Sequence, residues 1–140
     1  MKLKQQNDSD SATLEQCSDD VVCTGQMTEC VSIILLCTDN TCYGIHCGGG
    51  ITGGWPEKIV KLFTDTLKKC KKLIVIFGGS YQDTTERPFL AYKVDAVKDI
   101  FTKIAAGSIE IYSSRDFEYN ISSGKTNEDC KTLNEKLEWK

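Results

Sequence analysis

Residues 31–47 read Val31-Ser32-Ile33-Ile34-Leu35-Leu36-Cys37-Thr38-Asp39-Asn40-Thr41-Cys42-Tyr43-Gly44-Ile45-His46-Cys47, two apolar runs on either side of a polar turn. The first run is β-branched and apolar at consecutive positions, which is typical of a strand buried on both faces. The second run returns after turn-forming residues, so the stretch predicts a β-hairpin at the centre of the sheet.

The length of the turn decides which side chains share a face of this hairpin. A two-residue turn at Asp39-Asn40 pairs Cys30 with Gly49 and puts Cys30 and His46 on opposite faces. A three-residue loop that begins at Thr38 pairs Cys30 with Gly48 instead. Cys30 and His46 are then diagonal neighbours on one face, with backbones roughly 7–8 Å apart. Asn40 tolerates the left-handed conformation that the longer loop requires, so the loop and this register are compatible.

Outward from the hairpin, strands and helices alternate. Apolar patterns predict strands at 21–24, 73–77, 109–112 and 117–121, and amphipathic helices at 56–69 and 93–106. Residues 48–54, which contain five glycines, are expected to form an irregular loop. We expect a polar, disordered or loosely ordered lead-in over 1–19 and a single domain over 20–140. The fold class is α/β, a mixed β-sheet or β-sandwich with packed helices.

Composition limits the classes of partner. The 140 residues carry a net charge of −3, and the basic residues are dispersed, so we expect no nucleic acid ligand. The longest apolar run, Val31 to Cys37, is too short to span a membrane, and the first residues contain no apolar core of a signal peptide. The eight cysteines admit three interpretations, namely disulfides, a metal site, or reduced thiols with one reactive member. We expect no metal and no cofactor.

The predicted hairpin brings a thiol to the only histidine of the chain. Cys30 precedes one strand, His46 lies near the end of the next, and a glycine loop and a helix follow. This arrangement, with Thr24 six residues before Cys30 and with Phe77-Gly78-Gly79 closing a later strand, resembles the CheD chemoreceptor glutamine deamidases and the cytotoxic necrotizing factors. The resemblance covers about residues 21–125. The residues just before Cys30 and just after His46 depart from the CheD pattern, which favours a substrate other than a chemoreceptor.

The resemblance implies a protein glutamine deamidase, with Cys30 as nucleophile, His46 as base and Thr24 orienting the imidazole. Gly48, Gly49 and Gly50 would let an extended substrate approach closely. The partner would be a protein bearing a target glutamine, with no membrane involved and the enzyme a monomer. The chain would act in the cytoplasm or as a secreted effector, a toxin or virulence factor, delivered into a host cell.

Two other functions fit the same residues. The pattern Gly48-x-Gly50-x-x-Gly53 after a strand matches a dinucleotide-binding fingerprint, but the acidic residue expected about 20 positions later is missing. Nucleotide or phosphate binding through the Gly48–Gly54 loop is therefore one alternative. The other is a non-catalytic, cysteine-rich interaction module held by disulfides or zinc.

Overall fold

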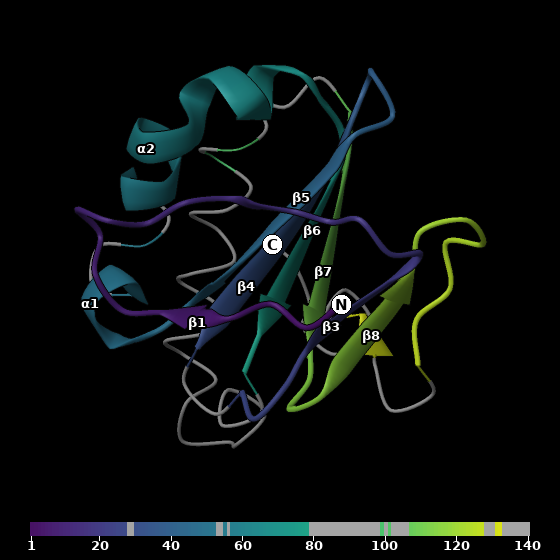
Figure 1. Ribbon diagram of the computed structural model, residues 1–140, viewed down its shortest axis with the longest axis horizontal. Helices are drawn as coiled ribbons and strands as arrows, with labels where there is room; N and C mark the ends of the chain where they lie inside the picture. The colour runs from purple at the N-terminus through teal and green to yellow at the C-terminus, as the bar shows by residue number, and fades with distance from the viewer. Residues whose placement is uncertain are drawn as a thin grey trace.

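A computed structural model describes residues 1–27, 30–52, 55, 57–78, 99, 101, 107–127 and 131–132. The protein has a mixed α/β fold that is mostly sheet (Figure 1). The larger sheet has the strand order β1-β5-β4-β6-β7-β9, with β2 also paired to β5. Its strands are β1 (Gln5–Gln6), β2 (Glu15–Gln16), β4 (Val31–Cys37), β5 (Cys42–Cys47), β6 (Cys70–Phe77), β7 (Ser108–Ser113) and β9 (Lys131–Thr132). A second sheet pairs β3 (Val21–Thr24) with β8 (Phe117–Asn120).

The larger sheet separates two apolar layers. Side chains of β4 alternate between them, Ile33 and Leu35 in one and Ile34 in the other. The first layer packs under α1 (Gly49–Thr52) and α2 (Glu57–Lys68), and the second lies between the large sheet and the β3–β8 pair. Figure 1 shows the helices to the left of the sheet and β3 and β8 to its right. Because both faces are covered, β4 is apolar at every position except Ser32 rather than alternating.

The central hairpin forms with the three-residue loop that the sequence predicts. Val31 pairs with Cys47 and Ser32 with His46, which is the register that the longer loop produces. The backbone N–H of Cys37 donates to the carbonyl of Thr41 at 2.9 Å, closing the loop. Asn40 adopts a left-handed conformation with φ of 67°, as such a loop needs. The prediction of this turn is therefore confirmed.

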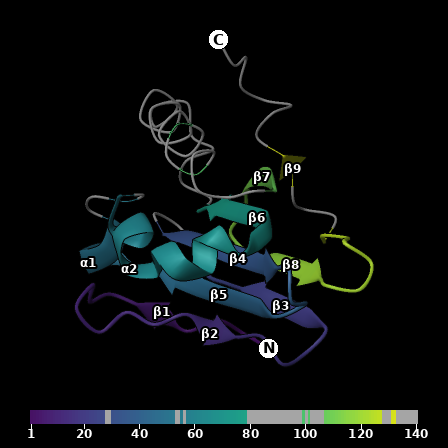
Figure 2. The same ribbon diagram turned by 90° about the horizontal axis from the view of Figure 1, so that it is seen from above.

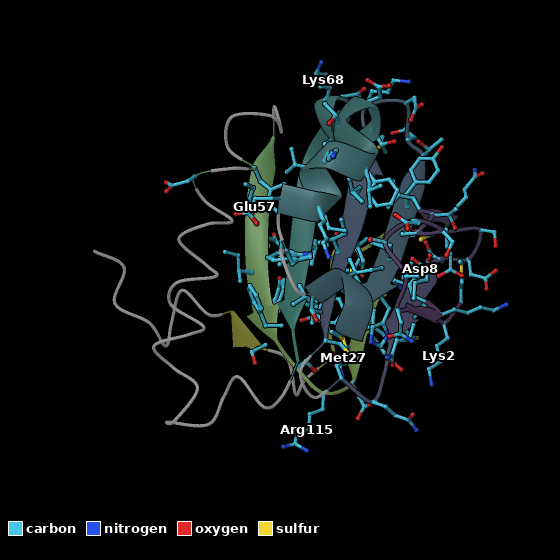
Figure 3. The ribbon with its side chains drawn as sticks, turned by 90° about the vertical axis from the view of Figure 1, so that its left-hand side faces the viewer. Lys2, Asp8, Met27, Glu57, Lys68 and Arg115 are labelled. Carbon is cyan, nitrogen blue, oxygen red and sulfur yellow. The ribbon has the colours of Figure 1, made fainter. Side chains whose placement is uncertain are left out.

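Helix α2 agrees with the sequence prediction to within a residue or two. Glu57 in its first turn and Lys68 in its last place favourable charges at the two ends of the helix dipole, and Figure 3 shows these side chains at opposite ends of the helix. Most of the helix expected at 93–106 lies outside the described residues. Phe101, which is helical, is buried, and its ring centroid lies 6.0 Å from that of Trp55.

The first residues of the chain differ from the expected loose lead-in. Strand β1 pairs in parallel with β5, and β2 pairs with it antiparallel, so both cover the outer edge of β5 (Figure 2). Leu3 is only 2% exposed and belongs to the layer between the sheets. The segment is ordered because one apolar anchor and the open hydrogen-bonding edge of β5 hold it, although its composition is polar.

Candidate functional site

His46 lies on β5 on the face that looks toward β3 and β8. It is directly opposite Ser32 of β4 and directly beside Gln5 of β1. The side chain is 2% exposed, and its Nε2 atom has no hydrogen-bond partner among the described residues. Burial, and then the positive charge of Lys2, lower the pKa of the imidazole below its usual value. The ring is therefore neutral at neutral pH and able to accept a proton.

Cys30 stands just before β4, two residues before Ser32 in the hairpin register. Its half-buried side chain packs against the apolar layer between the sheets, the same layer that His46 faces. Its carbonyl accepts a hydrogen bond of 2.8 Å from the N–H of Gly78, which ties the end of β4 to the end of β6. Continued one residue past its last pair, the hairpin register puts Cys30 and His46 on one face as diagonal neighbours, which is the placement that the three-residue loop predicts. The Nε2 atom of His46 makes no hydrogen bond to the Cys30 sulfur.

Thr24 does not orient His46 directly. Its side chain is buried, and its hydroxyl donates to the sulfur of Met27 at 2.7 Å. The hydroxyl of Ser32 donates to the same sulfur at 3.5 Å. The direct hydrogen bond from Thr24 to the imidazole that the resemblance implies is absent from the described contacts, because Met27 accepts from Thr24 instead. In Figure 3, Met27 lies at the end of the sheet near Arg115, whose carbonyl accepts from the Met27 N–H at 2.9 Å.

The three glycines expected to receive substrate have different surroundings. Gly48 is buried, and a Cβ on it would lie 2.1 Å from Oδ1 of Asn7 and 2.5 Å from Nε2 of Gln5. Gly49 is exposed and has open space where a Cβ would be. Gly50 lies in α1, so the stretch expected to be an irregular loop contains a short helical turn. Gly48 is therefore covered by the N-terminal residues Gln5 and Asn7. The expectation that Gly48 faces substrate directly is corrected by this contact.

The same glycine bears on nucleotide binding. The fingerprint needs free backbone N–H groups for a pyrophosphate. The N–H of Gly48 already donates to the carbonyl of Gln6 at 2.8 Å. The last glycine of the pattern, Gly53, lies outside the described residues. In the described part of the glycine pattern, the N–H of Gly48 is therefore engaged in the pairing of β1 with β5.

An open pocket of about 450 Å³ lies beside His46. The N-terminal segment contributes Lys2, Leu3, Lys4 and Gln5 to its lining, the turn after β3 contributes Gly25 and Gln26, and β5 contributes His46. Gln26 has a φ of 56°, an uncommon conformation for a residue other than glycine. Sequence reasoning did not include the N-terminal residues in the site. Only the isolated apolar Leu3 in a polar stretch could have indicated that this segment packs.

Two other cysteines near the hairpin, Cys47 and Cys17, have shifted pKa values. Burial, with a smaller effect of Cys30, raises the pKa of Cys47 to about 12, so this thiol stays protonated. A hydrogen bond with Cys42 lowers the pKa of Cys17, which lies across from it at the β2–β5 edge. The seven cysteines of the described residues form no disulfide among themselves. No group of three potential metal ligands gathers among the residues that the structure describes.

Comparison with known proteins adds no family assignment. No protein-family model matches the chain, and a search of curated proteins finds no significant match. Within the described residues, no helix has the length and apolar character needed to cross a membrane.

Proposed function

We propose that the protein is a cysteine-dependent protein glutamine deamidase, with a fold and chemistry like those of the CheD and cytotoxic-necrotizing-factor deamidases. The observation that carries the proposal is the hairpin register. It sets Cys30 and His46 on one face of adjacent strands, and His46 also lines an open pocket. The lowered pKa of His46 supports the same assignment, since a general base must be deprotonated.

The reaction needs only these two side chains and water. His46 accepts the proton of the Cys30 thiol, and the thiolate attacks the carboxamide carbon of a glutamine. The carbon–nitrogen bond breaks as the imidazolium returns the proton to the leaving ammonia, and a thioester remains. Water then attacks the thioester while His46 accepts its proton. The sulfur leaves and is reprotonated, so one carboxamide and one water give one carboxylic acid and ammonia.

Thr24 has an indirect role in this proposal. Its hydroxyl and that of Ser32 both donate to the sulfur of Met27, and Ser32 lies directly opposite His46. Thr24 thereby fixes Met27 against Ser32, the residue across the hairpin from His46. It is a positioning residue, so Thr24→Val is expected to weaken turnover without abolishing it. The substrate is a protein, and an effector acting on a host protein fits the departures from the chemotaxis enzymes.

The test is deamidation of a protein target. The full chain, incubated with a cell extract, should convert a specific glutamine to glutamate, seen by mass spectrometry together with released ammonia. Cys30→Ser and His46→Gln should each abolish the conversion, whereas the matched control Cys23→Ser, a half-buried cysteine of β3, should not. Thermal unfolding of each variant shows whether it is folded. Full activity in a folded Cys30→Ser protein would exclude covalent catalysis at this residue.

A further inference from the structure

The N-terminal segment borders the pocket beside His46 and pairs with both sheets. Near its start, the N–H of Leu3 donates to the carbonyl of Cys23 in β3 at 2.9 Å. Two residues later, Gln5 pairs with His46 in β5, and the carbonyl of Gln6 accepts from Gly48. Figure 1 shows the segment running in front of the sheet from β3 to β1. An extended peptide therefore occupies the outer edge of β5 by strand addition, a common way for a protein to bind a polypeptide.

Gln5 is the residue of this segment that meets the candidate site. Because partners in a ladder share a face, its side chain lies on the face that carries His46. Its Nε2 atom is so near Gly48 that a Cβ on that glycine would lie 2.5 Å away. Gly48 follows β5 at the position that the hairpin register sets opposite Cys30. The carboxamide of Gln5 thus lies beside His46, the proposed base. It also lies over Gly48, the residue opposite the proposed nucleophile Cys30.

Leu3 anchors the same segment two residues earlier, on the same face. A Cβ on Gly44 would lie 2.7 Å from Cδ1 of Leu3, so the leucine sits directly against the bare backbone of β5. Gly44 is two residues before His46, which matches the spacing of Leu3 and Gln5 in a parallel strand. Gln6, in contrast, points to the other side of the ladder, where its amide donates to the carbonyl of Thr13 at 2.8 Å.

We propose that the outer edge of β5 is the substrate-binding site, and that the N-terminal segment occupies it as a built-in substrate mimic. Gln5 takes the position of the target glutamine, and Leu3 fills an apolar subsite on Gly44. The inference rests on the proposed deamidase function. It specifies the substrate class: an extended polypeptide, parallel to β5, with an apolar residue two positions before the glutamine. Such a substrate gains access by displacing the N-terminal segment.

The first experiment tests the geometry without using activity. His46 is the single histidine of the chain, so the proton on its Cε1 atom gives one resolved NMR signal whose titration reports its pKa. In the untagged full chain, Gln5→Glu should raise the pKa of His46, because a carboxylate beside the imidazole favours its charged form. The matched control Gln6→Glu, on the opposite face, should shift it much less. Equal shifts in both variants would overturn the placement of Gln5.

The second experiment tests displacement and register. In the full chain, Leu3→Asp should release the segment, and a synthetic peptide with the sequence of residues 1–9 should then perturb the His46 signal. The same peptide carrying Leu3→Asp should not perturb it, and wild-type protein should respond less, because its own segment competes at an effective concentration of about a millimolar or more. Failure of the peptide to perturb a folded Leu3→Asp protein would overturn the inference.

Mass spectrometry of the same peptide separates the two proposals. Conversion at the position of Gln5, with Gln6 unchanged, supports both the deamidase and its register. Binding with no conversion at either glutamine leaves the edge of β5 as a peptide-binding site and counts against the deamidase. Equal conversion at Gln5 and Gln6 retains the chemistry and refutes the register.

Discussion

Truncation of Leu3 offers a quantitative test of how the N-terminal segment is held. Leu3 is the buried apolar side chain of a segment whose neighbours Lys2, Lys4 and Gln5 are exposed. Leu3→Ala removes three carbon groups from the layer between the sheets. At about 0.8 kcal/mol for each, the loss is about 2.4 kcal/mol, before any cost of a residual cavity.

This loss of burial free energy should favour local detachment of the N-terminal segment rather than unfolding of the whole domain. The N–H of Gly48 is protected by Gln6, and that of Leu3 by Cys23, so both report detachment of the segment. A loss of about 2.4 kcal/mol raises the open population by about 50-fold. Amide hydrogen exchange at these positions should therefore accelerate by roughly that factor, while the amide of Val75 in the middle of β6 changes little.

Lys4→Ala is the matched control, since Lys4 is exposed and lies between the same two hydrogen-bonded positions. It should leave all three exchange rates near those of the wild type. Unchanged exchange at Gly48 in Leu3→Ala would show that Leu3 is not the anchor. Equal acceleration at Gly48 and Val75 would show that the segment opens only when the whole domain unfolds, which would refute a displaceable strand.

Two predictions concern ionisation. Because the folded pKa of His46 lies below the unfolded value of 6.5, the unfolded chain binds the proton more readily. Stability should therefore fall as the pH is lowered through about 6.5, and His46→Gln should reduce the difference between urea midpoints measured at about pH 7.5 and about pH 5.5. Among the cysteines, alkylation of the native protein should modify Cys17 readily and Cys47 hardly at all, with peptide mapping as the measurement. Cys42→Ala should slow the labelling of Cys17; rapid labelling of Cys47 would contradict the assigned burial.

The central part of the fold could be predicted from sequence because its signals are local. The apolar run from Val31 to Cys37 indicates a strand covered on both sides, and the turn residue Asn40 selects the loop length. Loop length then fixes the register, and the register alone determines that Cys30 and His46 share a face. Each step uses neighbours in sequence, so no knowledge of the remaining chain is required.

The N-terminal strand could not be predicted in the same way, because its partners are distant. Gln5 and Gln6 carry no strand signal of their own, and they pair only because β5 presents an open edge. The contact of Thr24 with Met27 spans only three residues, but it depends on the conformation of the turn after β3, where Gln26 has a φ of 56°. A threonine six residues before a cysteine does not reveal that the sulfur of Met27 lies within reach of its hydroxyl. The surroundings of Gly48 follow from the same strand, since Gln5 and Asn7 cover it.

The buried Nε2 atom of His46 lowers the stability of the fold. A buried polar atom without a hydrogen bond costs about 1–3 kcal/mol, and a hydrophobic residue at this strand position would avoid that cost. Its neighbours on the same face are Ser32, whose hydroxyl donates to Met27, the small Gly44, and the displaceable side chains of the N-terminal segment. The unpartnered Nε2 is thus retained on a face whose cover beside β5 includes the anchored N-terminal segment. Such an arrangement is what a site requires if its base is to meet a polypeptide substrate and not a permanent partner within the fold.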